Sequence, residues 1–367
     1  MDFNYYIPTR IVSGRGCVKQ NAELLSKIGK KAFLMTGPSS AQKNGSLEDM
    51  TQALDSQGIA YQHYNKVKPN PSLQDVREAS QVAKEAGADF VIAIGGGSPM
   101  DAAKAVAVLT ACDVSDEDLL ALREFPAVLP LVTIPTTSGT GSEVTPYSIL
   151  TNDSLETKSF LNSHQIYPVL SFLDARYTIA LPKSITNATA VDGLSHSVEG
   201  FLAVRSTAMS RVFALESLRL LGKLLTKLGT EEALSLEERE GLLFASTLAG
   251  FVIAQSGTTA VHAMGYSLTY FKGIDHGVAN GMLMGAYLKF IQKSRPEDID
   301  AILGALGYES IDTLSQLIAD LVGAEPLPEE EILKFSGIAI NAGNIQNTTP
   351  KPSQAELAEM YRLSSGK

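Results

Sequence analysis

The sequence predicts an α/β half followed by an all-helical half. In the first half, short apolar runs alternate with amphipathic stretches, which is the pattern of a parallel sheet covered by helices on both faces. From about Pro182 onward, almost only helical periodicity remains, and Gly or Pro marks the breaks. The length of 367 residues suits two domains. No low-complexity linker separates the halves, and we place the boundary near residue 180, giving domains 1–180 and 181–367.

The elements follow from these patterns. Strands are expected at Lys31–Thr36, Ile59–Tyr64, Phe90–Ile94, Leu129–Ile134 and Val169–Leu173, and helices at Leu47–Gln57, Leu73–Ala86 and Pro99–Thr110. The segment Phe3–Val12, rich in Tyr and β-branched residues, fits either an edge strand or a strand exchanged between subunits. In the second half, helices are expected at 183–203, 208–227, 234–255, 258–270, 277–293, 308–323, 328–342 and 353–364.

Composition excludes several classes of protein. Apolar residues make up 44% and charged residues 19%, unlike a disordered chain or a fibre. No apolar run reaches the roughly 18–20 residues that span a bilayer, and the N-terminal segment lacks the pattern of a secretory signal. The net charge of −10 argues against nucleic acid or an acidic membrane as partner. Cys17 and Cys112 are expected to be free thiols in a reducing cytoplasm.

A glycine-rich junction follows one of the buried strands. Phe90–Ala107 reads FVIAIGGGSPMDAAKAVA, so the strand runs directly into Gly95, Gly96 and Gly97. We expect Ser98 to cap the next helix, with Asp101 completing a capping box. A helix N-terminus behind glycines suits a phosphate group. The alternative is a tight turn without a ligand.

A second polar loop follows another strand. Residues 135–143 read PTTSGTGSE, and their hydroxyls come from Thr136, Thr137, Ser138, Thr140 and Ser142. Ligands of doubly wound sheets bind beyond the carboxyl ends of the strands. Two such loops at that edge predict one shared nucleotide, although a Ser/Thr/Gly run is also common in ordinary loops.

Three of the five histidines, His196, His262 and His276, lie in the helical half. Asp192 and His196 have i, i+4 spacing, which places them on one face of a helix. His262 and His276 are separated by Gly265 and Gly273 and belong to different elements that can converge. A carboxylate and three imidazoles can bind a divalent transition metal. Ordinary core or surface histidines, with an Asp192–His196 hydrogen bond, are the alternative.

The blocks GGGSPMDAAKA, PTTSGTGSE, DGLSHSVEG and HAMGYSLTYFKGIDHG, in this order, resemble the iron-containing (group III) alcohol dehydrogenases along nearly the whole chain. The resemblance implies a Rossmann-like nucleotide-binding domain, a helical metal-binding domain, the fold shared with dehydroquinate synthase, and an active site in the cleft between them. It also implies a homodimer. The family's metal ligands correspond to Asp192, His196, His262 and His276. Three histidines favour Fe²⁺, although Zn²⁺ accepts the same ligands.

The implied activity is NAD(P)-linked hydride transfer between a small primary alcohol or aldehyde and the nicotinamide ring. The expected cofactor-binding residues are Gly37, Ser39, Ser40, Lys43, Gly95, Gly96, Gly97, Ser98, Asp101, Thr136, Thr137, Thr140, Ser142 and Lys158. Among these, Lys158 is assigned to the ribose by the resemblance.

The sequence departs from the family pattern near the ligands. Tyr266 stands where many members carry a second histidine, often assigned to proton relay, and it could replace that histidine or merely pack. Ala190-Val191 and Gly193 replace other small residues.

A further departure concerns the cofactor. Gly37 stands where some NAD-preferring members carry an aspartate after the second strand, and Ser39, Ser40 and Lys43 could bind a 2′-phosphate. We therefore predict a preference for NADP. The alternative is that Lys43 is solvated and both cofactors work.

Three other functions remain open. A zinc-dependent polyol dehydrogenase of the glycerol type is the nearest alternative. A lyase like 3-dehydroquinate synthase would need several basic residues for a phosphorylated substrate, and the segments around the four ligands offer little beyond Lys183 and Lys272. A binding module without turnover would be expected to lack a ligand or the glycine loop, and both are intact.

Overall fold

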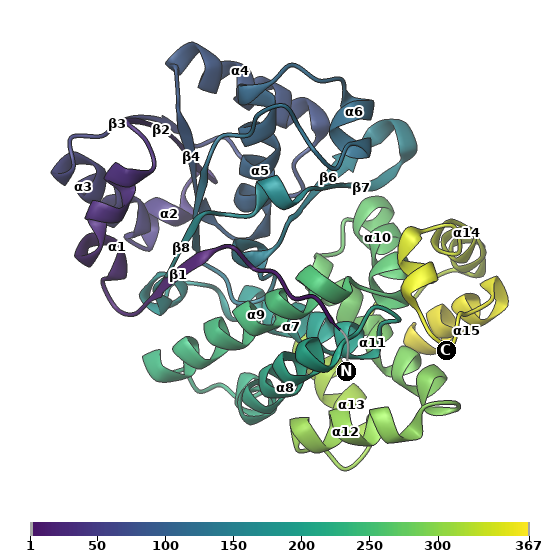
Figure 1. Ribbon diagram of the computed structural model, residues 1–367. Coiled ribbons are helices and arrows are strands. Elements are labelled where there is room, and N and C mark those ends of the chain that lie inside the picture. The colour runs from purple at the N-terminus through teal and green to yellow at the C-terminus, as the bar shows by residue number, and fades with distance from the viewer. Residues whose placement is uncertain (1–2, 366–367) are drawn as a thin grey trace. The chain divides into compact units, whose positions relative to one another are not determined.

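The computed structural model describes residues 3–365 and divides into two compact units. The α/β unit comprises Ile7–Thr137 and Ser142–Ala180. The helical unit comprises the chain up to Tyr6, Ser138–Gly141 and the chain from Leu181 onward. In Figure 1 the α/β unit runs from purple to teal, and most of the helical unit is green and yellow. The α/β unit therefore ends at Ala180. The N-terminal segment up to Tyr6 and the segment Ser138–Gly141 belong to the helical unit.

The α/β unit is built on a parallel six-stranded sheet with the order β1-β8-β5-β4-β2-β3. The strands are β1 (Arg10–Ser13), β2 (Lys31–Thr36), β3 (Ala60–Tyr64), β4 (Phe90–Gly95), β5 (Leu131–Pro135) and β8 (Leu170–Leu173). The chain passes from β2 outward to β3 and then returns to β4 on the other side of β2. This reversal between β2 and β4 is a topological switch point, where doubly wound sheets bind ligands.

Helices cover both faces of this sheet. They are α1 (Cys17–Gln20), α2 (Ser40–Lys43), α3 (Ser46–Ser56), α4 (Leu73–Ala86) and α5 (Gly97–Ala111). Alternate residues of a strand point to opposite faces, so Phe33 and Met35 of β2 pack with α4 and α5, while Ala32 and Leu34 pack with α1 and α3. The predicted parallel sheet with two helical layers is confirmed.

The sequence did not reveal several elements of the α/β unit, among them two strands and a short helix. Strands β6 (Tyr147–Asn152) and β7 (Thr157–Asn162) form an antiparallel hairpin apart from the main sheet. The short helix α6 (Asp116–Ala121) contacts β7. The segment Phe3–Val12, predicted as an edge or exchanged strand, includes most of the edge strand β1, which pairs with β8.

The helical unit contains nine helices within the part of the chain that the structure describes. They are α7 (Lys183–Leu202), α8 (Ala208–Leu228), α9 (Leu236–Ser256), α10 (Ala260–Lys272), α11 (His276–Gln292), α12 (Pro296–Leu306), α13 (Ile311–Val322), α14 (Glu329–Ala339) and α15 (Gln354–Ser364). The sequence predicts eight of them and misses α12. Helix α7 lies among α8, α9, α11 and α13 and is buried over most of its length.

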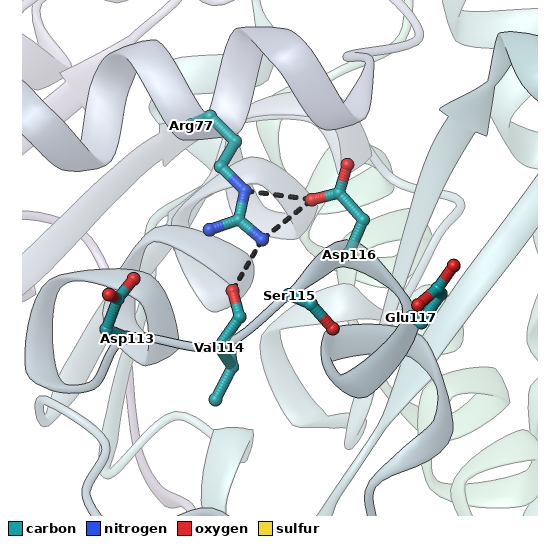
Figure 2. Close-up of a pocket in the computed structure, with 6 residues that line it drawn as sticks. All are labelled: Arg77, Asp113, Val114, Ser115, Asp116 and Glu117. Carbon is teal, nitrogen blue, oxygen red and sulfur yellow. Dashed lines mark hydrogen bonds and ion pairs between the residues drawn. The ribbon is translucent and has the colours of Figure 1, made fainter.

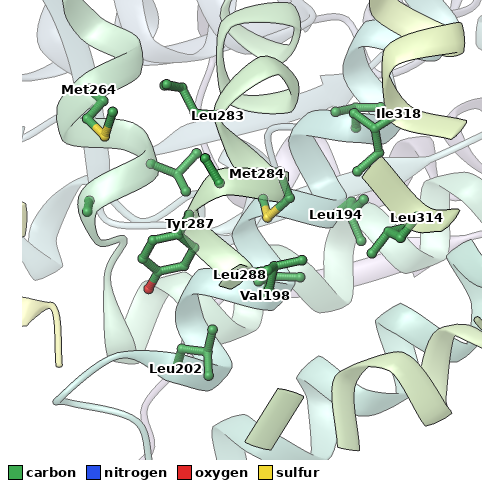
Figure 3. Packing of buried hydrophobic residues seen from close by; sticks show 14 of the residues in the cluster. Leu194, Val198, Leu202, Met264, Leu283, Met284, Tyr287, Leu288, Leu314 and Ile318 are labelled. Carbon is green, nitrogen blue, oxygen red and sulfur yellow. The ribbon is translucent and has the colours of Figure 1, made fainter. Parts of the chain in front are cut away.

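Apolar side chains from several helices meet around α7. Figure 3 shows Leu194 and Val198 of α7 beside Met284 and Leu288 of α11, with Ile318 of α13 nearby. This core fixes the position of α7, which carries two of the predicted metal ligands. Within residues 3–365, no single helix is both long and apolar enough to cross a membrane. Only the pair α9 and α10 meets those criteria together, with a bend of 108° between them.

Candidate metal centre and nucleotide-binding loops

The structure brings the four predicted ligands together inside the helical unit. Asp192 and His196 lie on α7, His262 lies on α10 and His276 begins α11. The Asp192 Oδ1 atom is 3.9 Å from His196 Nε2 and 3.8 Å from His276 Nε2. The Nε2 atoms of His196 and His262 are 3.0 Å apart. Asp192, His196 and His262 are buried, whereas the His276 side chain is 32% exposed, so the cluster is accessible on the His276 side.

Hydrogen bonds orient two of these imidazoles. His196 Nδ1 lies 3.1 Å from the carbonyl oxygen of Gly139, which can only accept, so His196 Nδ1 must carry the proton. His262 Nδ1 is hydrogen-bonded to the carboxylate of Glu199 and donates in the same way. In the neutral rings, both Nε2 lone pairs then face each other beside the Asp192 carboxylate. Such an arrangement of acceptors fits a cation, and imidazole with carboxylate suits iron or zinc.

The pKa shifts favour the metal-binding forms of Asp192 and His196, whereas that of His262 favours its charged form. Burial raises the pKa of Asp192, but His196, His276 and His262 outweigh burial and hold that pKa below its usual value. Burial lowers the pKa of His196 and keeps the ring neutral, as a metal ligand must be. Burial also opposes a charge on His262, but the neighbouring Glu199 carboxylate raises the pKa of His262 above its ordinary value.

Sequence reasoning missed Asn280 and Glu199, two buried residues beside the ligands. Asn280 Nδ2 lies 3.1 Å from Asp192 Oδ1, 3.3 Å from His262 Nε2 and 3.2 Å from His276 Nε2. The Oδ1 atom of Asn280 is buried without a hydrogen-bond partner. Helical spacing contained the signal, because Asn280 is four residues after His276 and Glu199 is three residues after His196.

Two of the departures from the family pattern lie at this centre. The Tyr266 ring is stacked on His276 with centroids 5.9 Å apart and meets His262 edge-on at 6.3 Å. Tyr266 therefore lies beside two of the predicted ligands, and its role in proton relay stays a prediction. A Cβ added at Gly193 would lie 3.5 Å from the Gly139 carbonyl oxygen, an ordinary contact, so alanine also fits there.

The nucleotide-binding prediction concerns the carboxyl edge of the sheet. The neighbouring strands β2, β4 and β5 end at Thr36, Gly95 and Pro135, and the register pairs Thr36 with Ile94 and Gly95 with Pro135. The loops that follow these three strands therefore begin at the same edge, next to the switch point. They contain most of the predicted cofactor-binding residues.

The glycine junction enters α5 without a side-chain cap. Gly95 has a φ of 154°, and Gly96 is the N-cap, with no side-chain hydrogen bond to the first turn. A Cβ added at Gly96 would lie 3.0 Å from Thr137 Oγ1, so glycine permits the close approach of the two loops. The first-turn N–H groups and the helix dipole suit a phosphate.

The predicted capping box at this helix is wrong. The helix already begins at Gly97, so Ser98 lies inside the first turn. The Ser98 hydroxyl instead accepts a hydrogen bond from the backbone N–H of Asn70 at 3.2 Å. Because three glycines can adopt the entry geometry without a capping side chain, the chain does not need Ser98 as the N-cap.

Asp101 and Ser142 form a buried polar contact within the α/β unit. The Ser142 hydroxyl donates to Asp101 Oδ1 at 2.6 Å, and the Ile149 N–H donates to Asp101 Oδ2 at 3.0 Å. The fully buried Lys104 donates to Ser142 Oγ at 2.7 Å and to the Tyr147 carbonyl at 2.7 Å. Burial lowers the pKa of Lys104 to about 8. These bonds tie the β6–β7 hairpin to α5.

Lys158 of β7 is linked to the glycine junction through Asn70. Lys158 Nζ donates to Asn70 Oδ1 at 2.7 Å, and the Asn70 N–H donates to Ser98. Burial lowers the pKa of Lys158 to about 8, even though Asp101 raises it. A cation thus lies near the N-terminus of α5, consistent with the predicted contact to a nucleotide.

The remaining predicted residues follow the strands β2 and β5, and one of them belongs to the helical unit. Gly37 directly follows β2, and Ser39, Ser40 and Lys43 are exposed in and beside the short helix α2. Thr136 and Thr137 directly follow β5 and belong to the α/β unit, and the Thr136 N–H donates to the Gly95 carbonyl at 2.9 Å. Thr140 belongs to the helical unit, in the short segment whose Gly139 carbonyl orients His196.

A surface pocket of about 510 Å³ lies elsewhere in the α/β unit (Figure 2). It is lined by Arg77 of α4 and by Asp113–Glu117. Arg77 is paired with Asp116 at 2.7 Å and donates to the Val114 carbonyl at 2.6 Å. The guanidinium therefore holds α4 to the start of α6, and the pocket contains none of the predicted site residues.

Comparison with known proteins identifies the family. The family model for iron-containing alcohol dehydrogenase matches residues 8–175, and the model for the C-terminal part of that family matches residues 186–365. A solved iron-containing alcohol dehydrogenase from Thermotoga maritima is 38% identical with a TM-score of 0.92, covering 100% of both chains.

Two curated relatives agree with this result. Alcohol dehydrogenase 4 of Schizosaccharomyces pombe is 30% identical over 86% of this chain and 77% of its own length. The NAD-dependent methanol dehydrogenase of Bacillus methanolicus is 29% identical over 86% of this chain and 83% of its own length. Because the two family models match residues 8–175 and 186–365 and the ligand cluster is in place, the chain belongs to the iron-containing alcohol dehydrogenase family and is an oxidoreductase of alcohols and aldehydes.

Proposed function

We propose that the protein transfers a hydride between small primary alcohols or aldehydes and NADP, with Fe²⁺ held by Asp192, His196, His262 and His276. The observation that carries this proposal is the pair of Nε2 atoms 3.0 Å apart, whose Nδ1 atoms are both engaged as donors. The comparisons favour this reading over a zinc-dependent polyol dehydrogenase.

Residues around the metal centre have separate roles in the proposed reaction. A bound metal supplies a Lewis acid that lowers the pKa of the substrate hydroxyl. Gly139 and Glu199 orient His196 and His262 for that task. The hydride passes from the carbinol carbon to the nicotinamide ring, and the hydroxyl proton must leave. Tyr266, stacked on His276 at the accessible side of the cluster, is the proposed relay for that proton.

Cofactor binding is assigned to the edge of the α/β unit. The first turn of α5, with Gly96 and Gly97, would bind the pyrophosphate, and Thr137 and Lys158 flank it. The methanol dehydrogenase relative is NAD-dependent by name. In this chain Ser39, Ser40 and Lys43 follow Gly37 after β2, and their side chains are suited to bind a 2′-phosphate. This arrangement supports a preference for NADP.

A Gly37→Asp variant tests this preference. An added Cβ at Gly37 meets only the Val67 carbonyl at 3.7 Å and Ser40 Oγ at 3.8 Å, so the variant should fold normally. A carboxylate there would repel a 2′-phosphate, and we expect kcat/KM for NADP to fall on the order of 100-fold. The kcat/KM for NAD should stay within about threefold. Steady-state kinetics with both cofactors measures the effect.

Two lysine variants make the cofactor test specific. Lys43→Met should lower kcat/KM for NADP about tenfold more than kcat/KM for NAD, because it removes one cationic partner of the 2′-phosphate. Lys84 is an exposed lysine in the last turn of α4. The control Lys84→Met should leave kcat/KM for both NADP and NAD unchanged. A wild-type enzyme that already prefers NAD would refute the NADP assignment.

The activity itself is tested by reduced-nicotinamide absorbance with a panel of short alcohols and aldehydes. Turnover that disappears with a chelator and returns with Fe²⁺ supports the proposal. Full activity with Zn²⁺ alone would instead favour polyol oxidation. Cofactor binding without turnover would favour a sensor.

We also propose a cytoplasmic homodimer. The free thiols of Cys17 and Cys112 suit a reducing compartment, and β1, at the edge of the sheet, offers unpaired backbone groups to a second copy. Light scattering on the purified protein and fractionation of cells test these two points.

A further inference from the structure

We propose that Glu199 is the positioning residue of the metal centre: it fixes the tautomer and orientation of His262 and also caps the helix that carries it. This inference rests on the proposed metal-dependent function. Glu199 lies on α7, one turn beyond His196, and its side chain is fully buried. Asp192, His196 and Glu199 therefore share one face of the same helix.

The two carboxylate oxygens have different tasks. Oε2 accepts the hydrogen bond from His262 Nδ1, which leaves His262 Nε2 directed at His196. Oε1 accepts from the Thr259 N–H at 2.8 Å, the Thr259 hydroxyl at 2.8 Å and the His262 N–H at 3.3 Å. One oxygen thus orients the ring, and the other anchors the backbone of the same residue.

The backbone contacts lie at the start of α10. Thr259 is the N-cap of this helix, and its own side chain makes no capping bond. The N-terminal N–H groups of a helix have no partner within the helix, and a carboxylate there is also favoured by the helix dipole. Glu199 of α7 supplies the hydrogen-bond acceptor that the first N–H groups of α10 lack within their own helix. The hydroxyls of Thr259 and Tyr287 are 2.9 Å apart and extend the network to α11.

This arrangement predicts a specific defect for Glu199→Gln. The two backbone N–H groups hold the amide oxygen at the Oε1 position, so the NH₂ group must face His262 Nδ1. An amide NH₂ can only donate, so Nδ1 becomes the acceptor and the proton moves to Nε2. His262 then presents an N–H where a metal needs a lone pair. The shape of the side chain is nearly unchanged.

The test measures metal binding without turnover. Metal-free wild type, Glu199→Gln and the control Thr259→Val are titrated with Zn²⁺ and Co²⁺ against a competing chelator. Glu199→Gln should bind on the order of 10–100-fold more weakly. Thr259→Val should bind within about threefold of wild type, because it loses only one partner of Oε1 and keeps the His262 contact, although its Tm falls by roughly 2–5 °C.

Nitrogen NMR of His262 provides the second readout. In the wild type, Nδ1 should carry the proton, and in Glu199→Gln the proton should be on Nε2. Equal metal affinity of wild type and Glu199→Gln would overturn the assignment. Equal losses of metal affinity in Glu199→Gln and Thr259→Val would also overturn the assignment, since they would show that Glu199 acts only through the stability of α10. A wild-type chain that binds neither metal would overturn the metal centre itself, and this inference with it.

Discussion

Replacing Asp192 with asparagine is expected to lower kcat/KM for alcohol oxidation on the order of 1000-fold, because a Lewis acid contributes several kcal/mol to such a barrier. The substitution preserves the volume of a buried side chain and the contact to Asn280, so the fold should persist. What it removes is the negative charge at the centre of three imidazoles. Steady-state kinetics and metal content, measured on the same preparation, test this result.

Asp275→Asn is the matched control. Asp275 is an exposed N-cap residue next to His276, and its side chain makes no capping bond. The same chemical change there should alter kcat/KM by less than about twofold, since asparagine is an equally good N-cap. If Asp192→Asn retained both its iron and its activity, Asp192 would not be a ligand.

Replacing Gly277 with alanine should be the most destabilising change that a single methyl group can make near the site. An added Cβ would overlap the carbonyl oxygen of Ala188, with the Ala188 carbonyl carbon 2.7 Å away and Asp192 Cβ 3.2 Å away. These are atoms of α7, whose backbone cannot move without disturbing the core. We expect a loss of about 3 kcal/mol or more and a fall in Tm of roughly 10 °C.

The same variant should weaken metal binding, because it separates His276 from Asp192. Gly304→Ala provides the comparison, since a Cβ at this position in α12 has no atom within 4 Å. That change should stabilise the protein by about 0.5–1 kcal/mol, as alanine is favoured over glycine inside a helix. Thermal unfolding of both variants checks the contrast. An unchanged Tm in Gly277→Ala would mean that α7 and α11 are not packed this closely.

Much of the fold could be predicted from the sequence because strong apolar patterns coincide with buried elements. Strand β2 at Lys31–Thr36 and helix α4 at Leu73–Ala86 have the predicted bounds. The hairpin was missed because its strands are rich in Ser, Thr and Asn, and β6 alternates buried and half-buried residues away from the main sheet. Helix α12 was missed because its eleven residues follow α11 after a short break.

The metal ligands could be predicted from the sequence because few residue types bind transition metals. Three histidines and one aspartate drew attention because histidine is rare in this chain. Glu199 and Asn280 did not stand out, because a glutamate or an asparagine on a helix is usually a surface residue. Only the structure shows that both are fully buried beside the ligands. Likewise, the sequence could not show that three glycines would take the place of Ser98 at the start of α5.

Metal analysis of wild type and Asp192→Asn, purified without oxygen and compared in the same assay, decides whether the four predicted ligands bind iron. We expect iron stoichiometric with the wild-type chain, activity that is lost on chelation and restored by Fe²⁺, and little iron in the variant. Full activity of metal-free wild type, or equal iron in both proteins, would contradict the assignment of Asp192, His196, His262 and His276.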